Sequence, residues 1–272
     1  MFMRLFNHWL IKILTVVLIG VIVWLLIHRS PRIPPDVYPF LASLQPELVT
    51  QCQEEGSNIS PDAWADLLAI KSVLTESQFK ESLQPQFQNL IKQIYKNVPW
   101  AELNWGSLDR QTIAKIKRRR SILLGYRYYH PGQYTFPVVG KTWYEDTFGA
   151  GREGGKRKHE GTDLFGPEGT PIVSVSSGKV EKLGWNRLGG ERVGIRGDDG
   201  NYYYYAHLKQ ISPSLFIGKK VAKGEYIGSM GHTGDALATP DHLHFGIQLP
   251  NSQWINPFPF LAVWQQQIRS RS

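Results

Sequence analysis

The distribution of apolar and polar residues divides the chain into three stretches of different character. Residues 10–27, LIKILTVVLIGVIVWLLI, contain a single charge, at Lys12, and have no polar face. Residues 36–124 place apolar side chains at helical spacing. After Gly125, short apolar runs alternate with Gly, Pro and Asp turns, as in a domain of short strands. The pattern therefore predicts an apolar helix, a helical region and a β domain, in that order.

The first stretch has the length of a membrane span. Eighteen helical residues extend about 27 Å, close to the roughly 30 Å hydrocarbon core of a bilayer. A cleaved signal peptide is the alternative, but HRSPRIPP follows the run where small residues would mark a cleavage site. We therefore predict an uncleaved single-pass anchor in residues 1–29 and a stiff linker in residues 30–35. With so short an N-terminal tail, we expect the rest of the chain to be translocated to the outer side of the membrane.

The helical region, residues 36–124, contains no chemical motif. Its last predicted helix, in SLDRQTIAKIKRRR, would be capped by Ser107. The basic run at residues 115–120 has two interpretations: a site for anionic lipid or wall polymer, or solvated cations at a helix C-terminus. We interpret the region as a spacer or as a docking module for a protein partner.

The third stretch predicts a mainly β domain of antiparallel strands over residues 132–262, followed by a polar tail at 263–272. GDDGN, between Ile195 and Tyr202, is typical of a hairpin turn. Side chains alternate along a strand, so half of the tyrosine run 202–205 should be core and half should line a groove.

Composition narrows the possible functions. The 272 residues carry a formal charge of +8, which favours an anionic neighbour. Nucleic acid is a poor candidate because the predicted topology places the charge outside the cell. Cys52 is the one cysteine, which excludes an intramolecular disulfide and a multi-cysteine metal site.

The candidate chemistry lies in the β domain. In PDHLHFGI, His242 and His244 should share one strand face, about 6.5–7 Å apart. In KHEGTDLFG, Gly161 argues against a helix, and a turn followed by a strand would bring His159 and Asp163 around one point. Two histidines and a carboxylate, with water in the fourth position, make an open catalytic zinc site.

Further imidazoles accompany this ligand set. Zinc lowers the pKa of its water towards about 7, and a second imidazole beside the metal suits proton transfer. One histidine of the 242/244 pair would bind metal and the other would act on the water. His207 follows an aromatic strand, YYYYAHL, and adds another imidazole. Each motif alone is more often a pair of surface or core residues, and the combination is what points to a site.

HEGTD, YYYYAHL and HLHF, in that order, resemble the M23 family of zinc metallopeptidases, of the LytM and lysostaphin type, which cut peptide bonds in peptidoglycan. The resemblance covers about residues 132–262 and implies a small antiparallel β fold of the lysostaphin type. It implies one Zn²⁺ per chain, held by His159, Asp163 and His244. His207 and His242 would flank the metal-bound water as general base and transition-state stabiliser, with the two roles not divided between them.

The resulting functional hypothesis is a membrane-anchored zinc endopeptidase that hydrolyses peptide bonds in peptidoglycan with zinc-activated water. The alternative is a non-enzymatic cell-wall-binding or scaffold protein that recruits partners through its helical region. The complete ligand set favours the enzyme. His232, in GHTG, is interpreted as a turn histidine near the site and is left out of it.

Overall fold

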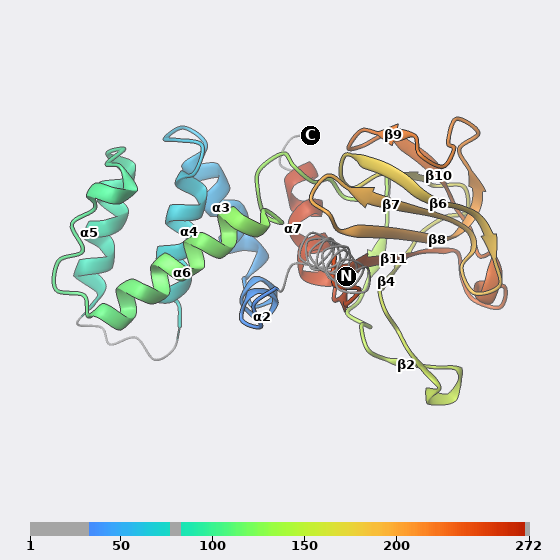
Figure 1. The fold of residues 1–272 in the computed structure, drawn as a ribbon, viewed down its shortest axis with the longest axis horizontal. Helices are drawn as coiled ribbons and strands as arrows, with labels where there is room; N and C mark the ends of the chain where they lie inside the picture. Colours follow the sequence, from blue (N-terminus) through green and yellow to red (C-terminus); the bar gives the residue numbers. More distant parts are fainter. Residues whose placement is uncertain (1–32, 77–82, 270–272) are drawn as a thin grey trace, which may run out of the picture. The chain divides into compact units, whose positions relative to one another are not determined.

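The computed structural model describes residues 33–76 and 83–269 (Figure 1). From Pro34 onward these residues form a single compact unit. The predicted anchor, residues 10–27, lies outside the described residues. Within the described ranges, no helix is long and apolar enough to cross a membrane.

Helices occupy the region where the apolar spacing predicted them. The central helix, α4, is buried on nearly all sides and packs against α3, α5 and α6. The helix bounds are α2 (Val37–Ala42), α3 (Pro46–Gly56), α4 (Ala63–Leu74), α5 (Gln84–Tyr95), the short 3-10 helix η2 (Trp100–Glu102) and α6 (Arg110–Tyr126).

The start of α6 differs from the predicted one. Asp109, not Ser107, is the cap, because its Oδ1 accepts the backbone N–H groups of Gln111 and Thr112, both at 2.9 Å. A carboxylate there satisfies two of the otherwise unpaired N–H groups of the first turn.

The basic run at residues 115–120 lies in the middle of α6, so its interpretation as a helix end is wrong. Four of its cations form ion pairs with carboxylates of the neighbouring segments, and Lys117 lies over the Trp105 ring. These pairs are Lys115 and Arg119 with Glu76, Arg118 with Asp36, and Arg120 with Asp62 and Asp66.

The remainder of the unit is built on one sheet, and every strand pairing in the described ranges is antiparallel. The main path through the sheet runs in the order β1 (Trp143–Tyr144), β4 (Thr162–Phe165), β11 (His242–Gln248), β8 (Tyr202–Ile211), β7 (Gly190–Gly197), β6 (Gly178–Asn186) and β9 (Lys220–Val221). Off this path, β10 (Tyr226–Met230) pairs with β5 (Pro171–Val173) and with β8, and β12 (Trp254–Ile255) pairs with β11.

A separate hairpin, β2 (Gly151–Arg152) and β3 (Arg157–Lys158), stands apart from the sheet (Figure 1). The 3-10 helix η3 (Glu153–Gly155) connects its two strands.

Alternation along the strands separates the core from the opposite face of the sheet. Leu243, Phe245 and Ile247 of β11 are fully buried, and so are Tyr203 and Tyr205 of β8. The intervening residues of both strands face the other side. The β7–β8 turn falls at the predicted GDDGN. The sequence therefore predicted both the strand type and the division of the tyrosine run.

The last described residues form a helix, α7 (Phe258–Arg269), where the sequence suggested a polar tail at 263–272. Val263 and Trp264 are fully buried, and the Trp264 Nε1–H donates to the Tyr128 carbonyl at 3.0 Å. The prediction of a polar tail was wrong for residues 263–269, because the apolar residues on one face of α7 belong to the core.

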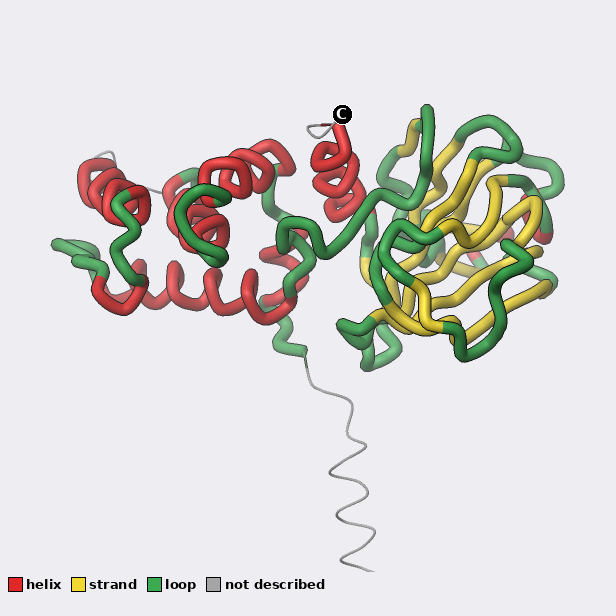
Figure 2. Tube along the Cα trace, turned by 90° about the horizontal axis from the view of Figure 1, so that it is seen from above, coloured by secondary structure: helices red, strands yellow, loops and turns green. Residues whose placement is uncertain are grey.

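Helix α7 also joins the two regions of the unit. It lies beside both the helices and the strands in Figure 2, and it packs against α3. The Gln266 side chain bonds Thr50 and Glu47 of α3. Its polar residues are thus used for contacts with α3 while its apolar residues enter the core.

Candidate active site

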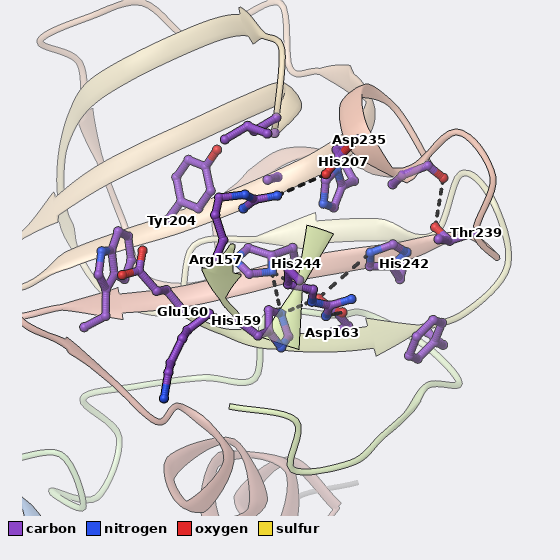
Figure 3. Close-up of a pocket in the computed structure, with 18 of the residues that line it drawn as sticks. Arg157, His159, Glu160, Asp163, Tyr204, His207, Asp235, Thr239, His242 and His244 are labelled. Carbon is purple, nitrogen blue, oxygen red and sulfur yellow. Dashed lines mark hydrogen bonds and ion pairs between the residues drawn. The ribbon is translucent and has the colours of Figure 1, made fainter. Parts of the chain in front are cut away.

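Strands β4 and β11 place three of the predicted residues on one face of the sheet. The register pairs His244 with Asp163 and His242 with Phe165. Cross-strand partners share a face, so Asp163, His242 and His244 project to the same side. His159 reaches them from the turn that precedes β4 (Figure 3).

Three donor atoms converge on one point. His159 Nε2, Asp163 Oδ1 and His244 Nδ1 lie 3.0 Å from one another in each pair. Two ligand atoms of one tetrahedral zinc are roughly 3.3 Å apart, given metal–ligand distances of about 2.0–2.1 Å. The donor set and its spacing therefore fit a divalent metal ion.

The hydrogen bond of His159 Nδ1 determines which nitrogen of this ring can bind a metal ion. Its Nδ1 lies 3.0 Å from the carbonyl oxygen of Thr147, which can only accept, so Nδ1 carries the proton. Nε2 is therefore left with a free lone pair towards Asp163 and His244. Such a hydrogen bond behind a histidine ligand is typical of metal centres.

The surroundings favour an ionised Asp163 and a neutral His244. Burial alone would raise the pKa of Asp163, but the adjacent imidazoles of His159 and His244 hold that pKa well below its ordinary value. Burial lowers the pKa of His244. Arg152 of the hairpin binds the second oxygen, Oδ2, of Asp163. An ionised carboxylate and a neutral imidazole are the forms in which these side chains bind a metal ion.

Close packing behind the ligands explains Gly161. A Cβ atom at this position would lie 2.6 Å from Cε1 of His244 and 2.5 Å from the Phe245 carbonyl oxygen. Only glycine lets the turn pass this close to the histidine, and the turn carries both His159 and Asp163.

A second pair of imidazoles lies beside the three donors. The rings of His207 and His242 have centroids 4.9 Å apart. The Nδ1–H of His207 donates to the Thr233 carbonyl, and that of His242 to the Pro240 carbonyl, both at 2.8 Å. Each ring therefore keeps an unprotonated Nε2, and that of His242 lies 3.9 Å from Asp163 Oδ1. Burial, followed by the nearby His244 and His242, lowers the pKa of His207 to about 4.

His207 faces the site because its strand is irregular. Regular alternation would place it with Tyr203 and Tyr205 in the core. Its φ of 61° is left-handed, and the β7–β8 pairing shifts register between Tyr205 and Leu208. The extra residue turns the imidazole to the opposite face.

All five predicted residues line one cavity of about 420 Å³ (Figure 3). Tyr204 and Thr239 lie at opposite ends of it, with the histidines between them. The β2–β3 hairpin forms part of its lining through Arg152, Arg157 and Lys158. The sequence signal for these cations was the basic run GREGGKRK, but nothing in it indicated which of them reach the cavity.

His232 lies outside the group of five, as expected. Its Nδ1 is 2.7 Å from Asp241 Oδ1, and Glu168 completes a second, more exposed cluster. Glu168 also forms an ion pair with Lys209 at 3.2 Å.

Comparisons with known proteins find similarity to one peptidase family. The profile described as peptidase family M23 matches residues 157–257. The L-Ala–D-Glu endopeptidase of Bacillus subtilis is 37% identical over 167 residues, which is 57% of this chain and 51% of that protein. Lysostaphin of Staphylococcus staphylolyticus is 37% identical over 108 residues, 38% of this chain and 22% of that protein. The chain thus spans about half or less of the length of these two curated relatives.

A solved structure extends the likeness beyond the sheet. The crystal structure of a LytM protein from Ruminococcus gnavus superposes with a TM-score of 0.56 at 25% identity, covering 86% of this chain and 92% of that one. That coverage includes helices as well as strands. Residues 157–257, which carry the converging His159, Asp163 and His244, therefore match the domain of peptidase family M23.

Proposed function

We propose that the protein is a membrane-anchored zinc endopeptidase that hydrolyses peptide bonds in peptidoglycan. The observation that carries the proposal is the convergence of His159 Nε2, Asp163 Oδ1 and His244 Nδ1 within one cavity that two further imidazoles share. Zinc held by these three residues would supply Lewis-acid polarisation and a nucleophile from water at neutral pH.

The chain's own residues supply the proton transfers. His207 and His242 present Nε2 atoms that are free to accept a proton, because backbone carbonyls hold both Nδ1–H groups. An imidazole that has taken up a proton can then donate it to the developing oxyanion or to the leaving amine. Fixed orientation towards the cavity suits both histidines for this work.

Similarity supports the substrate class. The relative that matches over the longest stretch described above is named for the bond between L-Ala and D-Glu. We therefore propose this bond of the peptidoglycan stem as the substrate.

Residues 10–27 support the membrane location, since their length and composition suit one span. In this proposal the cavity faces the cell wall. A protein partner of helices α2–α6 stays a prediction. The location is tested by fractionation: full-length protein should sediment with membranes and be digested by protease added from outside. Recovery of a soluble chain that begins after residue 27 contradicts the anchor.

The activity is tested with full-length protein in detergent, purified peptidoglycan and zinc. Mass spectrometry should find new L-Ala carboxyl ends and new D-Glu amino ends. The His244→Ala protein, prepared in the same way, should produce none. Binding to peptidoglycan without new ends would overturn the enzyme and support the wall-binding alternative.

A further inference from the structure

Arg157 connects the two sides of the cavity. It lies on β3 of the hairpin, and its Nη2 donates to Glu153 Oε1 at 3.0 Å and to Asp235 Oδ2 at 3.1 Å. Asp235 belongs to η4 (Gly234–Ala236), which packs on β7 and β8. Figure 3 shows Arg157 reaching towards Asp235 near the catalytic histidines.

The hydrogen-bonding capacity of Arg157 is only partly used. A guanidinium carries five N–H donors. Both of these hydrogen bonds use one nitrogen, Nη2, and the buried Nε has no partner within the described ranges. An unpaired buried donor is costly, so a ligand with two acceptor oxygens would bind better than the present arrangement.

The present partners are easily replaced. The side chains of Glu153 and Asp235 are 37% and 47% exposed. Exposed ion pairs contribute little stability. A carboxylate that enters the cavity and binds Arg157 through two parallel hydrogen bonds would therefore displace Asp235 at small cost.

The surroundings favour an anion. The hairpin, residues 151–158, carries four cations and one carboxylate. Lys158 and Arg152 line the same cavity as Arg157. Asp235 already presents a carboxylate oxygen to Arg157, so the structure itself displays the chemistry of the ligand.

We propose that Arg157 forms a carboxylate-binding subsite beside the catalytic histidines, which selects peptides with a free carboxylate next to the cleaved bond. Asp235 occupies this subsite in the free protein, and the substrate's carboxylate replaces it. The inference rests on the proposed function, and it identifies a chemical requirement. A glutamyl residue that continues the chain through one carboxyl group keeps its second carboxyl free, so a D-Glu after the cleaved bond meets the requirement.

The test compares two synthetic peptides, L-Ala–D-Glu–L-Lys linked through the γ-carboxyl, with the α-carboxyl either free or converted to the amide. Full-length zinc-loaded protein should cleave the free acid with a kcat/KM roughly 10–100-fold higher, the range for one hydrogen-bonded charge. The difference should lie mainly in KM, because the contact is made in the ground state as well.

Variants assign the preference to the subsite. Arg157→Gln should bring the ratio of the two peptides close to one, and Arg157→Lys should retain part of it. Asp235→Asn should lower the KM of the free acid roughly two- to fivefold, because it weakens the competing ion pair. Arg196→Gln is the matched control: this arginine of β7 pairs with Glu181 outside the cavity lining and should keep the wild-type ratio.

A binding measurement separates this inference from the proposed function. Calorimetry with the slow His242→Ala protein should show tighter binding of the free acid than of the amide. Equal binding and equal cleavage of the two peptides overturn the subsite while leaving the endopeptidase intact. A preference in binding with no cleavage by wild type supports the subsite and overturns the enzyme. An Arg157→Gln protein whose kcat/KM falls by the same factor for both peptides also overturns the subsite.

Discussion

At the scale of single residues, the site combines regular and irregular backbone. His242 and His244 share a face because β11 is a regular strand between two partners. His207 reaches the same cavity only through a left-handed φ of 61° and a register shift. Its imidazole is then held by the Thr233 carbonyl. Regular alternation thus positions His244, the proposed metal ligand of β11, and a local bulge positions one of its neighbours.

The two histidines of β11 should respond differently to substitution. His244→Ala removes one of three donors, so zinc content and activity should fall together. His242→Ala leaves all three donors, so most zinc should stay while the rate falls roughly 10²–10⁴-fold, the scale for a positioned acid or base. His207→Ala should resemble His242→Ala. Elemental analysis and peptidoglycan cleavage on the same preparations decide this, and loss of zinc from His242→Ala alone would reverse the roles.

Gly161→Ala should damage the site without touching a donor. The new Cβ would meet the His244 ring and the Phe245 carbonyl at 2.6 and 2.5 Å. Overpacking of this kind costs about 1–3 kcal/mol, and the displaced imidazole should bind zinc more weakly. Gly151→Ala is the control, since its nearest atom would be 3.7 Å away. Thermal melting and zinc content measure both effects, and equal behaviour of the two variants would refute the packing argument.

Sequence reasoning reached the residues whose positions follow from periodicity or from the M23 motifs. It predicted that His242 and His244 share a face because side chains alternate. It did not foresee the contacts of Thr147 with His159 or of Arg157 with Asp235, because these join segments that only the tertiary fold brings together.

At the scale of elements, apolar spacing predicted the helices better than it predicted their ends. Ser107 and Asp109 both lie before α6, and composition alone does not decide between two good capping residues. The helical structure of residues 263–269 was harder to predict from the sequence. QQQ in α7 is polar in composition, but Gln266 and Gln267 bond α3 and Gln265 accepts from Tyr144 of β1. Val263 and Trp264 enter the core.

Trp264 should therefore be a large contributor to stability. It is fully buried, stacks on Tyr134 at 5.0 Å and donates to the Tyr128 carbonyl. Trp264→Ala should cost about 3–5 kcal/mol of unfolding free energy. Ile268→Ala, at a position of the same helix that is 43% exposed, should cost far less. Urea denaturation measures both, and an unchanged midpoint for Trp264→Ala would restore the interpretation as a tail.

At the scale of the whole molecule, the helical region and the sheet are one compact unit from Pro34 onward. The junction is apolar and hydrogen-bonded: Tyr129 donates its hydroxyl to the Leu41 carbonyl at 2.8 Å, and Gln53 donates to the Tyr129 carbonyl at 2.6 Å. The sequence indicated two regions with different periodicity. It contained no signal for their packing, because these contacts join residues that lie far apart in the sequence.

A fragment that begins at residue 132 should consequently be less stable than residues 34–272. It lacks α2–α6 and would expose the face of α7 that packs on α3. We expect a lower melting temperature and binding of a hydrophobic dye. Equal melting of the two fragments would show that the sheet is stable without the helices.

Strand β11 is hydrogen-bonded on both sides, to β4 and to β8. Among the strands of residues 33–76 and 83–269, β2 and β3 pair only with each other. The two parts should therefore differ in how often they open. Amide protons of β11 should exchange with deuterium only in rare, large-scale unfolding events, while those of the hairpin exchange through frequent local openings. His244 and His242 would then keep their geometry while Arg157 moves away and returns as peptides bind and dissociate. The proposed catalytic centre would rarely open, whereas the hairpin at the edge of the cavity would open often.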